Sequence, residues 1–350
     1  MVRSRSIIAI PPGETIKELL EDRGMSQKEL ANRLDMSEKH ISKLINGEVQ
    51  LTMDVAKRLE MVLGPSVQFW CKLEAFYREA IVKANEENAM EADIAIAKKL
   101  PYKEMVHMGW LEDVTAWTER VVCLRKFFEV AQLSLLQEKL LPVIACRKLS
   151  DTEKSDLALL SWAQKAKLEA RQIETGSLKV EGIKKALPSL RKMTIMRPEE
   201  FCPELVRILA AKGVALVFLP HMKGSFLHGA TFKDGRKIVV GMTVRGKDAD
   251  KFWFSLFHEL GHIILGHVGR AEGLTEAEEQ DADAFARDAL VPKESYEAFV
   301  SEGEFSKASV CHFADSIGID VGILVGRLQK DGYLAYNRLN ELKSKYEFTA

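Results

Sequence analysis

Apolar residues in the first eighty positions recur at intervals of three and four, in short stretches separated by glycine and proline. This spacing is typical of amphipathic helices and predicts four of them. Each of the last three begins at a serine or threonine, whose hydroxyl oxygen would accept a hydrogen bond from a free backbone N–H group. The predicted helices begin near Glu14, Ser26, Ser37 and Thr52.

Two of these helices, about 27–34 and 37–46, follow one another across a tight turn and describe a helix-turn-helix. Ala31 is small where the two helices would cross, and Ile41 and Leu44 would anchor the second helix to a core. The other face of that helix is polar and could reach base edges and phosphates. The residues expected to contact DNA are Gln27, Ser37, Lys39, His40, Ser42 and Lys43. The alternative is a helical bundle with a solvated face.

The stretch SQKELANRLDMSEKHISKLINGE resembles the Cro/repressor-type helix-turn-helix, and residues 11–80 together resemble the HigA group of antitoxin-repressors. One departure is Asp35, which stands where the turn commonly has glycine. Aspartate tolerates a left-handed backbone better than most residues, so the turn is expected to survive. The resemblance implies binding to double-stranded operator DNA, including that of the protein's own operon.

A second helical pattern lies in the middle of the chain. Its apolar positions alternate in steps of four and three: Trp110, Val114, Trp117, Val121, Leu124, Phe128, Ala131 and Leu135. Such a seam predicts a coiled-coil-like helix, which would pair two copies of the chain into a homodimer or pack inside its own chain. Further apolar residues beside the seam widen the stripe and favour internal packing. The charged stretch 169–197 is predicted to be a connector.

After Pro198 the pattern changes to short apolar runs. A helix at 199–212 is followed by predicted strands at 214–219, 228–233 and 237–243, the last two joined by an Asp234–Gly235 hairpin turn. The stretch DADKFWFSLFHELGHIILGH then predicts a helix that is apolar nearly all round and therefore buried.

That buried helix carries His258 and His262, four residues apart, with Glu259 between them. Residues at this spacing lie on one helix face, about 5–6 Å apart, so both imidazoles could bind one zinc ion. Glu259 would lie near the open side of the ion and could take a proton from a water molecule there. This is the HExxH motif of zinc metallopeptidases.

A catalytic zinc site needs a third protein ligand. The next predicted helix, EAEEQDADAFARDALVP, offers Glu279, while Glu278 and Asp281 are rivals for the same role. Asp283, one turn beyond Glu279, could accept the other ring N–H group of a ligand histidine. His267 lies off the ligand face and is interpreted as structural. His228, beside a possible edge strand, is a weaker candidate for polarising a substrate carbonyl.

Residues 200–340, with FWFSLFHELGHIILGH, EQDADAFARDALVP and VGRLQKDGYL, resemble the ImmA/IrrE family of metallopeptidase domains. The resemblance implies that His258, His262 and Glu279 bind zinc and that Glu259 is the catalytic base. It also implies a gluzincin-like core with a small twisted sheet, whose edge strand can pair with an extended peptide. Family members commonly act on, or alongside, transcriptional repressors.

Composition limits these hypotheses only weakly. The formal net charge of −1 neither suggests nor excludes nucleic acid, and residues 1–80 contain equal numbers of basic and acidic residues, twelve of each. Five scattered cysteines without a CxxC pair argue against disulfides and a cysteine zinc site. No stretch is long and apolar enough for a signal peptide or a membrane span, so we expect a cytoplasmic protein without membrane contacts.

Together, these patterns predict a mainly α protein with a small α+β C-terminal domain. The predicted parts are a helix-turn-helix domain at 1–82, a helical connector at 83–197 and a metallopeptidase domain at 198–350. The expected function is a DNA-binding regulator that hydrolyses a peptide bond in a regulatory protein partner. The alternative is an antitoxin-repressor whose peptidase-like domain only binds a toxin or a signal.

Overall fold

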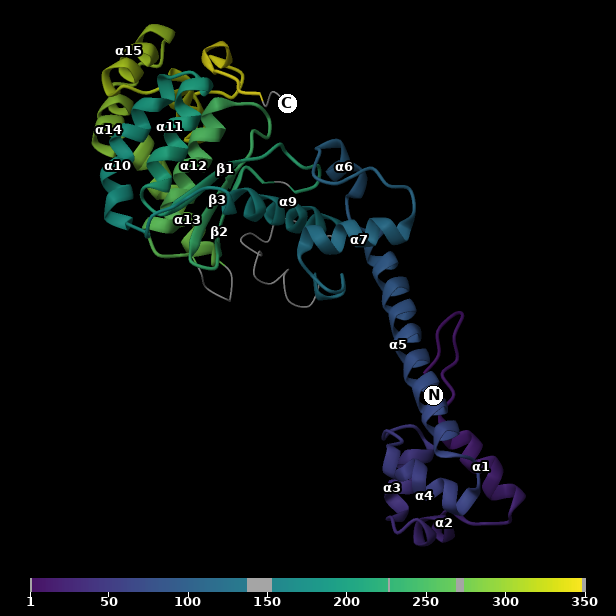
Figure 1. Cartoon of the computed structure of the whole chain (residues 1–350). Coiled ribbons are helices and arrows are strands. Elements are labelled where there is room, and N and C mark those ends of the chain that lie inside the picture. The colour runs from purple at the N-terminus through teal and green to yellow at the C-terminus, as the bar shows by residue number, and fades with distance from the viewer. Residues whose placement is uncertain (1, 137–152, 226, 269–273, 348–350) are drawn as a thin grey trace. The chain divides into compact units, whose positions relative to one another are not determined.

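The computed structural model describes residues 2–136, 153–225, 227–268 and 274–347. Cys146, one of the five cysteines, lies outside these ranges. The chain forms two compact units, Met1–Ala95 and Ile96–Ala350, and the boundary falls near the end of one long helix, α5 (Val67–Ala97). Helices dominate both units, and a small sheet lies in the second (Figure 1).

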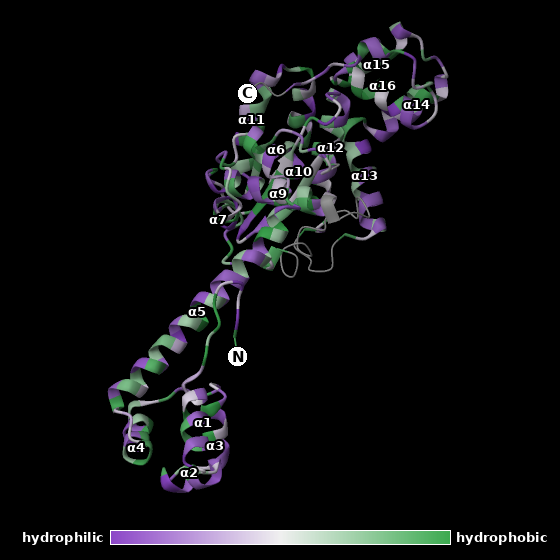
Figure 2. Cartoon of the chain, turned by 90° about the vertical axis from the view of Figure 1, so that its right-hand side faces the viewer, coloured by the Kyte–Doolittle hydropathy of each residue, from purple (hydrophilic) through white to green (hydrophobic). Residues whose placement is uncertain are grey.

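The N-terminal unit contains the four predicted helices, followed by most of α5. They are α1 (Pro12–Asp22), α2 (Gln27–Arg33), α3 (Glu38–Ile45) and α4 (Met53–Leu63). Hydrophilic and hydrophobic stretches alternate along these helices, as expected when one face of each is buried (Figure 2).

The predicted caps of this unit are confirmed. Ser26 accepts a hydrogen bond from the backbone N–H group of Glu29, Ser37 from that of His40, and Thr52 from that of Val55. Asp35 has a φ of 54°, so the turn between α2 and α3 does use the left-handed conformation expected of it.

Fourteen buried residues of α1 to α5 and their loops, including Ile16, Leu30, Ile41, Leu59 and Trp70, form one core. The second helix of the pair is anchored by Ile41 and Leu44, as predicted, and Ala31 is fully buried. Helix α1 approaches α3 so closely that a Cβ atom built on Gly13 would lie 1.8 Å from the carbonyl oxygen of Ile45.

The second unit begins with α6 (Tyr102–His107), α7 (Trp117–Phe128) and α9 (Glu153–Arg171). The prediction of a continuous coiled-coil-like helix through 110–135 is wrong: residues 110–116 are not helical, and α7 ends where Glu129 adopts a φ of 56°. Val121 and Leu124 are fully buried within their own chain. A periodic pattern of apolar residues cannot reveal a break in the helical backbone. Val121 and Leu124 pack inside their own chain instead of forming a dimer seam.

This burial gives a testable distinction between neighbouring valines. Val121 is 0% exposed, whereas Val122 is 41% exposed on the same helix. We expect Val121→Asp to lower the thermal midpoint of the second unit sharply, because a carboxylate without a partner in an apolar core costs several kcal/mol or changes its protonation. Val122→Asp is the matched control and should shift stability by no more than about 0.5 kcal/mol. Equal midpoints for the two variants, measured by circular dichroism, would show that Val121 is not in a core.

The charged stretch 169–197 is not a connector, contrary to prediction. It contains α10 (Val180–Lys192) and a short 3-10 helix (Met193–Ile195). Ile183, Leu190 and Met193 are buried in the main core of the second unit. Only one side of α10 contacts the core. The charged residues on its other sides made the stretch look like a solvated connector.

The three predicted strands are confirmed, with ends shifted by one residue: β1 (Val214–Phe218), β2 (Gly229–Asp234) and β3 (Lys237–Met242). Their order in the sheet is β1-β3-β2. β1 runs parallel to β3, with Val214 opposite Ile238, and β2 runs antiparallel to β3, with Gly229 opposite Met242. β2 is therefore an edge strand.

Helices cover both faces of the sheet. Side chains alternate between the faces of a strand, and Leu216, Val240 and Met242 share the main core with α12 (Ala249–Ile264). On the other face, Gly241 lies against α9, where an added Cβ atom would meet the Trp162 ring at 2.5 Å. The sheet thus holds α12 in a fixed position relative to β2.

The remaining helices complete the second unit. They are α11 (Pro198–Ala210), α13 (Glu276–Leu290), α14 (Lys293–Glu302), α15 (Lys307–Ile317), α16 (Val321–Lys330) and a 3-10 helix (Asn340–Leu342). Among the described residues, no single helix is long and apolar enough to cross a membrane; α15 and α16, bent by 115° at their junction, meet that test only as a pair.

Candidate functional site

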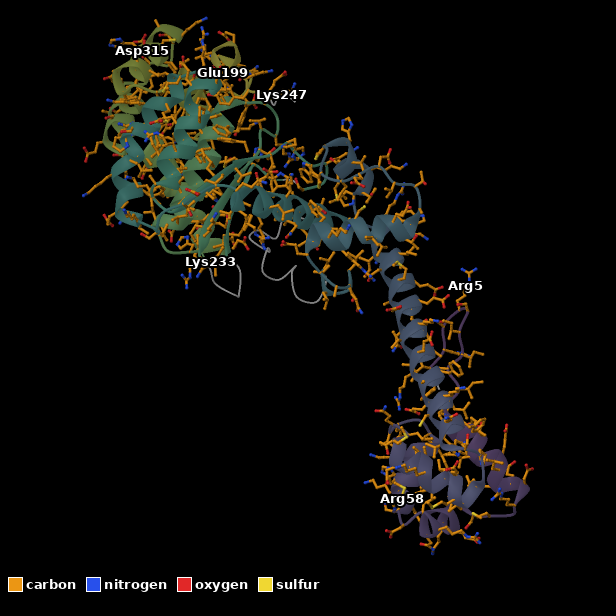
Figure 3. The ribbon with its side chains drawn as sticks, viewed as in Figure 1. Arg5, Arg58, Glu199, Lys233, Lys247 and Asp315 are labelled. Atoms are coloured by element: carbon orange, nitrogen blue, oxygen red, sulfur yellow. The ribbon has the colours of Figure 1, made fainter. Side chains whose placement is uncertain are left out.

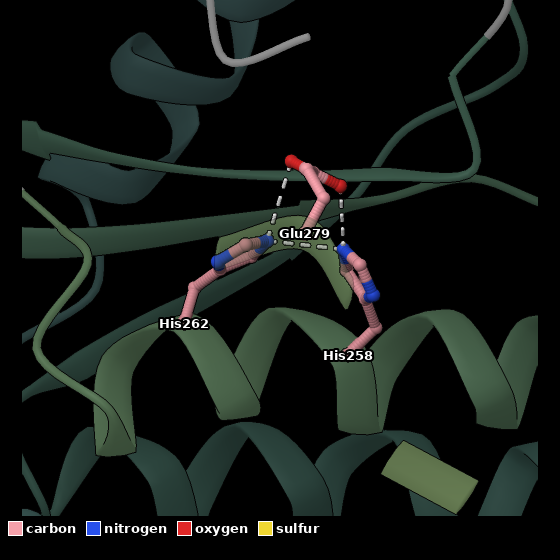
Figure 4. Close-up of side chains that lie close together, drawn as sticks. All are labelled: His258, His262 and Glu279. Atoms are coloured by element: carbon pink, nitrogen blue, oxygen red, sulfur yellow. Dashed lines mark hydrogen bonds and ion pairs between the residues drawn. The ribbon is translucent and has the colours of Figure 1, made fainter. Parts of the chain in front are cut away.

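Helix α12 presents the two motif histidines side by side. The Nε2 atoms of His258 and His262 are 3.0 Å apart, and both side chains are buried. Glu279 of α13 faces them, with one carboxylate oxygen 3.3 Å from Nε2 of His258 and the other 3.6 Å from Nε2 of His262 (Figure 4). These three residues form a group whose ligand atoms could hold a metal ion.

The rival acidic residues of α13 lie elsewhere. Glu278 belongs to a capping box, in which its carboxylate accepts a hydrogen bond from the Thr275 backbone while the Thr275 hydroxyl accepts one from Glu278. Asp281 is exposed to solvent. Within the described part of the chain, Glu279 is therefore the acidic residue that the geometry places beside the two histidines.

The three distances suit a small divalent ion. Ligand atoms at about 2.0–2.1 Å from a tetrahedral zinc are separated by roughly 3.3 Å. The observed separations of 3.0, 3.3 and 3.6 Å bracket that value. Two imidazoles and one carboxylate are also a donor set typical of catalytic zinc, which keeps its fourth position open.

Each histidine has a partner on its second ring nitrogen. Nδ1 of His258 lies 2.7 Å from a carboxylate oxygen of Asp283, as the sequence suggested. Nδ1 of His262 lies 3.1 Å from Nδ1 of His267, a contact that sequence reasoning missed. Such contacts set the tautomer and orientation of a metal-binding imidazole. The spacing of five residues gave no signal for His267, because the contact forms only where the chain leaves α12.

Glu259 lies on α12 beside the metal-binding group and is 7% exposed. The hydroxyl group of Thr231, on the edge strand β2, donates a 2.6 Å hydrogen bond to its carboxylate. Gly229 on the same strand lets the backbone approach, since an added Cβ atom would lie 3.0 Å from Cγ of Glu259 and 2.9 Å from Sδ of Met242. Neither Thr231 nor Gly229 was identified from sequence.

A cleft of about 770 Å³ opens beside these residues. His258, Glu259 and Asp283 line one part of it, together with His228 and Gly229 from the start of β2. The rest is lined by the first half of α12, the end of α13, α16 and residues near the C-terminus. The candidate metal centre, the edge strand and an open cleft therefore meet in one place.

Close packing between α12 and α13 brings Glu279 to the histidines. An added Cβ atom on Gly261 would lie 3.0 Å from the Phe285 ring and 3.4 Å from the backbone of Ala282. Gly261 thus permits the approach of α13 at the level of the candidate metal-binding residues.

The helix-turn-helix presents the side chains that were predicted to contact DNA. Gln27 at the start of α2 is exposed, as are Ser37, Lys39, Ser42 and Lys43 on or beside α3, while His40 is half-buried. Ser37 is also engaged as the cap of α3. Apart from Gln27 on α2, these residues form a polar surface on or beside α3, opposite its buried face.

Two arginines that sequence reasoning missed link separate elements of this unit. The Arg58 guanidinium (Figure 3) donates a 2.7 Å hydrogen bond to the carbonyl oxygen of Leu34, in the turn between α2 and α3. Arg23 donates to the carbonyl oxygens of Val62 and Leu63 at the end of α4. Both acceptors are backbone atoms distant in sequence, so no local pattern identifies them.

The balanced charge of this unit predicts a weak dependence of DNA affinity on salt. We expect Lys39→Ala and Lys43→Ala each to weaken binding to duplex DNA and to lower the slope of log K against log salt by about 1, because each lysine releases about one counterion. Lys72→Ala, which removes an exposed lysine of α5, is the matched control and should leave the slope unchanged. A steep slope that neither α3 lysine alters, measured by fluorescence anisotropy, would place the contact surface elsewhere.

Comparisons with known proteins concern this N-terminal unit. A family model described as helix-turn-helix matches residues 16–70. The chain is 33% identical over 63 residues to the uncharacterized HTH-type transcriptional regulator YddM of Escherichia coli (strain K12). That overlap covers 18% of this chain and 67% of the relative. The family-model match runs from α1 into the start of α5 and includes the whole polar surface of α3.

Proposed function

Because the chain belongs to the helix-turn-helix family of transcriptional regulators, we propose that it couples binding of operator DNA to zinc-dependent hydrolysis of a peptide bond in a regulatory protein partner. The DNA-binding half rests on the family and on the exposed polar face of α3. The hydrolytic half rests on one observation: His258, His262 and Glu279 converge beside Glu259 at the edge of an open cleft.

In this proposal His258, His262 and Glu279 hold the zinc ion. When bound, the ion would lower the pKa of a water molecule and polarise the carbonyl group of the peptide. Asp283 and His267 fix the two imidazole rings from behind, so that both Nε2 atoms point toward the ion.

Glu259 is the general base of the proposed reaction. Its carboxylate accepts the proton of the attacking water and passes it to the departing amine. The hydrogen bond from Thr231 orients this carboxylate beside the cleft.

The edge strand β2 offers a way to hold the substrate. Its outer side carries no strand partner in the described sheet, so an extended peptide could add there as a further strand. Gly229 and His228, at the start of β2, line the cleft beside Glu259. A peptide bound along β2 would thus pass the base, with His228 placed to contact a carbonyl group.

The decisive experiment combines metal analysis with incubation against natural candidates. Zinc content of the purified chain is measured by mass spectrometry, and the chain is mixed with the proteins encoded beside its gene, with and without a chelator. We expect about one zinc per chain and chelator-sensitive cleavage of one neighbour. Stable binding of a neighbour without cleavage would favour the alternative function, an antitoxin-repressor whose second unit only binds its partner.

Removal of one ligand tests the metal centre separately from the DNA-binding unit. We expect His258→Ala to lower zinc affinity by at least about 100-fold, as one of only three protein ligands is lost. Binding to duplex DNA should persist, because α1 to α4 form a separate compact unit. His312→Ala, which removes a histidine of α15 outside the metal-binding group, is the control. Unchanged zinc content in the His258→Ala chain would exclude this centre.

A further inference from the structure

Polar residues recur every fourth position along the face of α13 that meets α12. Glu279 belongs to the metal-binding group, and Asp283 contacts His258. Arg287 is the next in the series and lines the cleft. One helix face thus carries the metal ligand, the group that orients a histidine, and then a cation.

The guanidinium of Arg287 carries an unsatisfied donor. Its Nε atom is buried and makes no hydrogen bond within the described structure. Arg327, whose Nη1 atom is likewise buried without a partner among the described residues, still donates a 2.5 Å hydrogen bond from Nε to Asp331, and Lys343 lies 2.9 Å from Asp250. Burying a guanidinium nitrogen without a hydrogen-bond acceptor destabilises the folded protein. Buried polar atoms in proteins therefore usually have a partner, which can be a bound ligand.

The charge around Arg287 favours an anionic partner. Six lysine and arginine side chains line the cleft, against four carboxylates. Three of those carboxylates are already engaged: Asp283 with His258, Asp250 with Lys343 and Asp248 with Lys251. The fourth is Glu259, which accepts the hydrogen bond from Thr231. A guanidinium pairs with a carboxylate through charge-assisted hydrogen bonds, often two at once.

The walls of the cleft near the end of α13 are apolar. Leu290 and Val291 line it there, with Phe254 from α12 and Ile323 from α16. A glutamyl side chain combines the two requirements, since its methylene groups suit apolar walls and its carboxylate suits Arg287. Glu279 and Arg287 are eight residues apart, about 12 Å along the helix. An extended peptide covers that distance in roughly three to four residues.

We propose that Arg287 determines substrate specificity by binding the carboxylate of a glutamate in the peptide substrate, a few residues from the bond that is cleaved. This inference rests on the proposed peptidase function for its biological meaning. What it predicts directly is preferential binding of peptides that contain glutamate, which can be measured without hydrolysis.

The test uses the full chain carrying Glu259→Gln and acetylated, amidated octapeptides of alanine and serine. One glutamate is moved through successive positions, and each peptide has a glutamine counterpart. We expect the glutamate peptide to bind at least about 10-fold more tightly than its counterpart at one preferred position, measured by calorimetry. Adding Arg287→Met should abolish this preference, while adding Lys345→Met, which removes another cation of the cleft, should retain it.

Equal affinity for glutamate and glutamine peptides, or a preference that survives Arg287→Met, would overturn the proposal. Competition by free glutarate or inorganic phosphate with affinity equal to that of the peptide would also overturn it, by showing a site for small anions. Cleavage by the unmodified chain is followed separately with the same peptides. A glutamate preference without cleavage would refute the peptidase function alone, and cleavage without a preference would refute the Arg287 subsite alone.

Discussion

The Glu259→Gln chain is expected to retain its zinc and its DNA affinity while losing at least about 100-fold in the rate of peptide hydrolysis. Glutamine has nearly the same shape as glutamate but cannot accept the proton of an attacking water. His258, His262 and Glu279 are unchanged, so the metal-binding group should persist. The rate is measured on the cleaved neighbour protein by mass spectrometry, and zinc is quantified in the same preparation.

A second carboxylate-to-amide change controls for this experiment. The control variant is Glu278→Gln. Glu278 lies on α13 beside Glu279, but its carboxylate forms the capping box with Thr275. Glutamine can serve in a capping box, so this variant should hydrolyse the substrate at nearly the normal rate. Full activity in the Glu259→Gln chain would refute the mechanism, whereas equal loss in both variants would indicate a general effect of amide substitution near the site.

The second large effect is expected in the N-terminal unit. Replacing glycine with alanine inside a helix normally stabilises it by roughly 0.5–1 kcal/mol. Gly13→Ala should do the opposite, because the new methyl group would lie 1.8 Å from the carbonyl oxygen of Ile45 in α3. Backbone atoms cannot move aside as a flexible side chain can, so α1 and α3 must separate. We expect a loss of about 3 kcal/mol or more, and weaker DNA binding.

Gly24→Ala provides the comparison. Gly24 follows α1 with a φ of 61°, and an added Cβ atom there would meet nothing within 4 Å. That variant should lose only the roughly 1 kcal/mol that a left-handed alanine costs. Chemical denaturation of both variants is followed through tryptophan fluorescence, to which buried Trp70 contributes the signal of this unit. A Gly13→Ala unit that is more stable than the unmodified one would show that α1 does not pack closely on α3.

Features encoded by neighbouring residues could be predicted from the sequence. The helices and caps of the N-terminal unit, the left-handed Asp35 and the three strands all depend on short patterns, and the structure contains them. Likewise, a spacing of four residues places His258 and His262 together on any helix, and the structure brings Glu279 to them. Local geometry was enough to locate these elements.

Features that depend on contacts between distant segments could not be predicted. Thr231 reaches Glu259 only because β2 packs on α12, and Arg58 reaches Leu34 only because α4 packs beside the turn. The seam predicted at 110–135 failed because residues 110–116 are not helical, and because Val121 and Leu124 are buried within their own chain whereas Trp117 is 37% exposed. The packing of α10 in the core was not predicted, because charged residues lie among its apolar ones and only one side of the helix contacts the core.

The bond from Arg58 has a consequence for how this domain can change over evolutionary time. Its hydrogen bonds to the turn end on the backbone carbonyls of Leu34 and, at 3.5 Å, Asp35, and every amino acid has such a carbonyl. Substitutions at exposed Asp35 therefore leave the brace intact, whereas loss of the Arg58 side chain removes it. Different properties should therefore limit substitution on the two sides of one contact: tolerance of a left-handed backbone at Asp35, and the guanidinium group itself at Arg58.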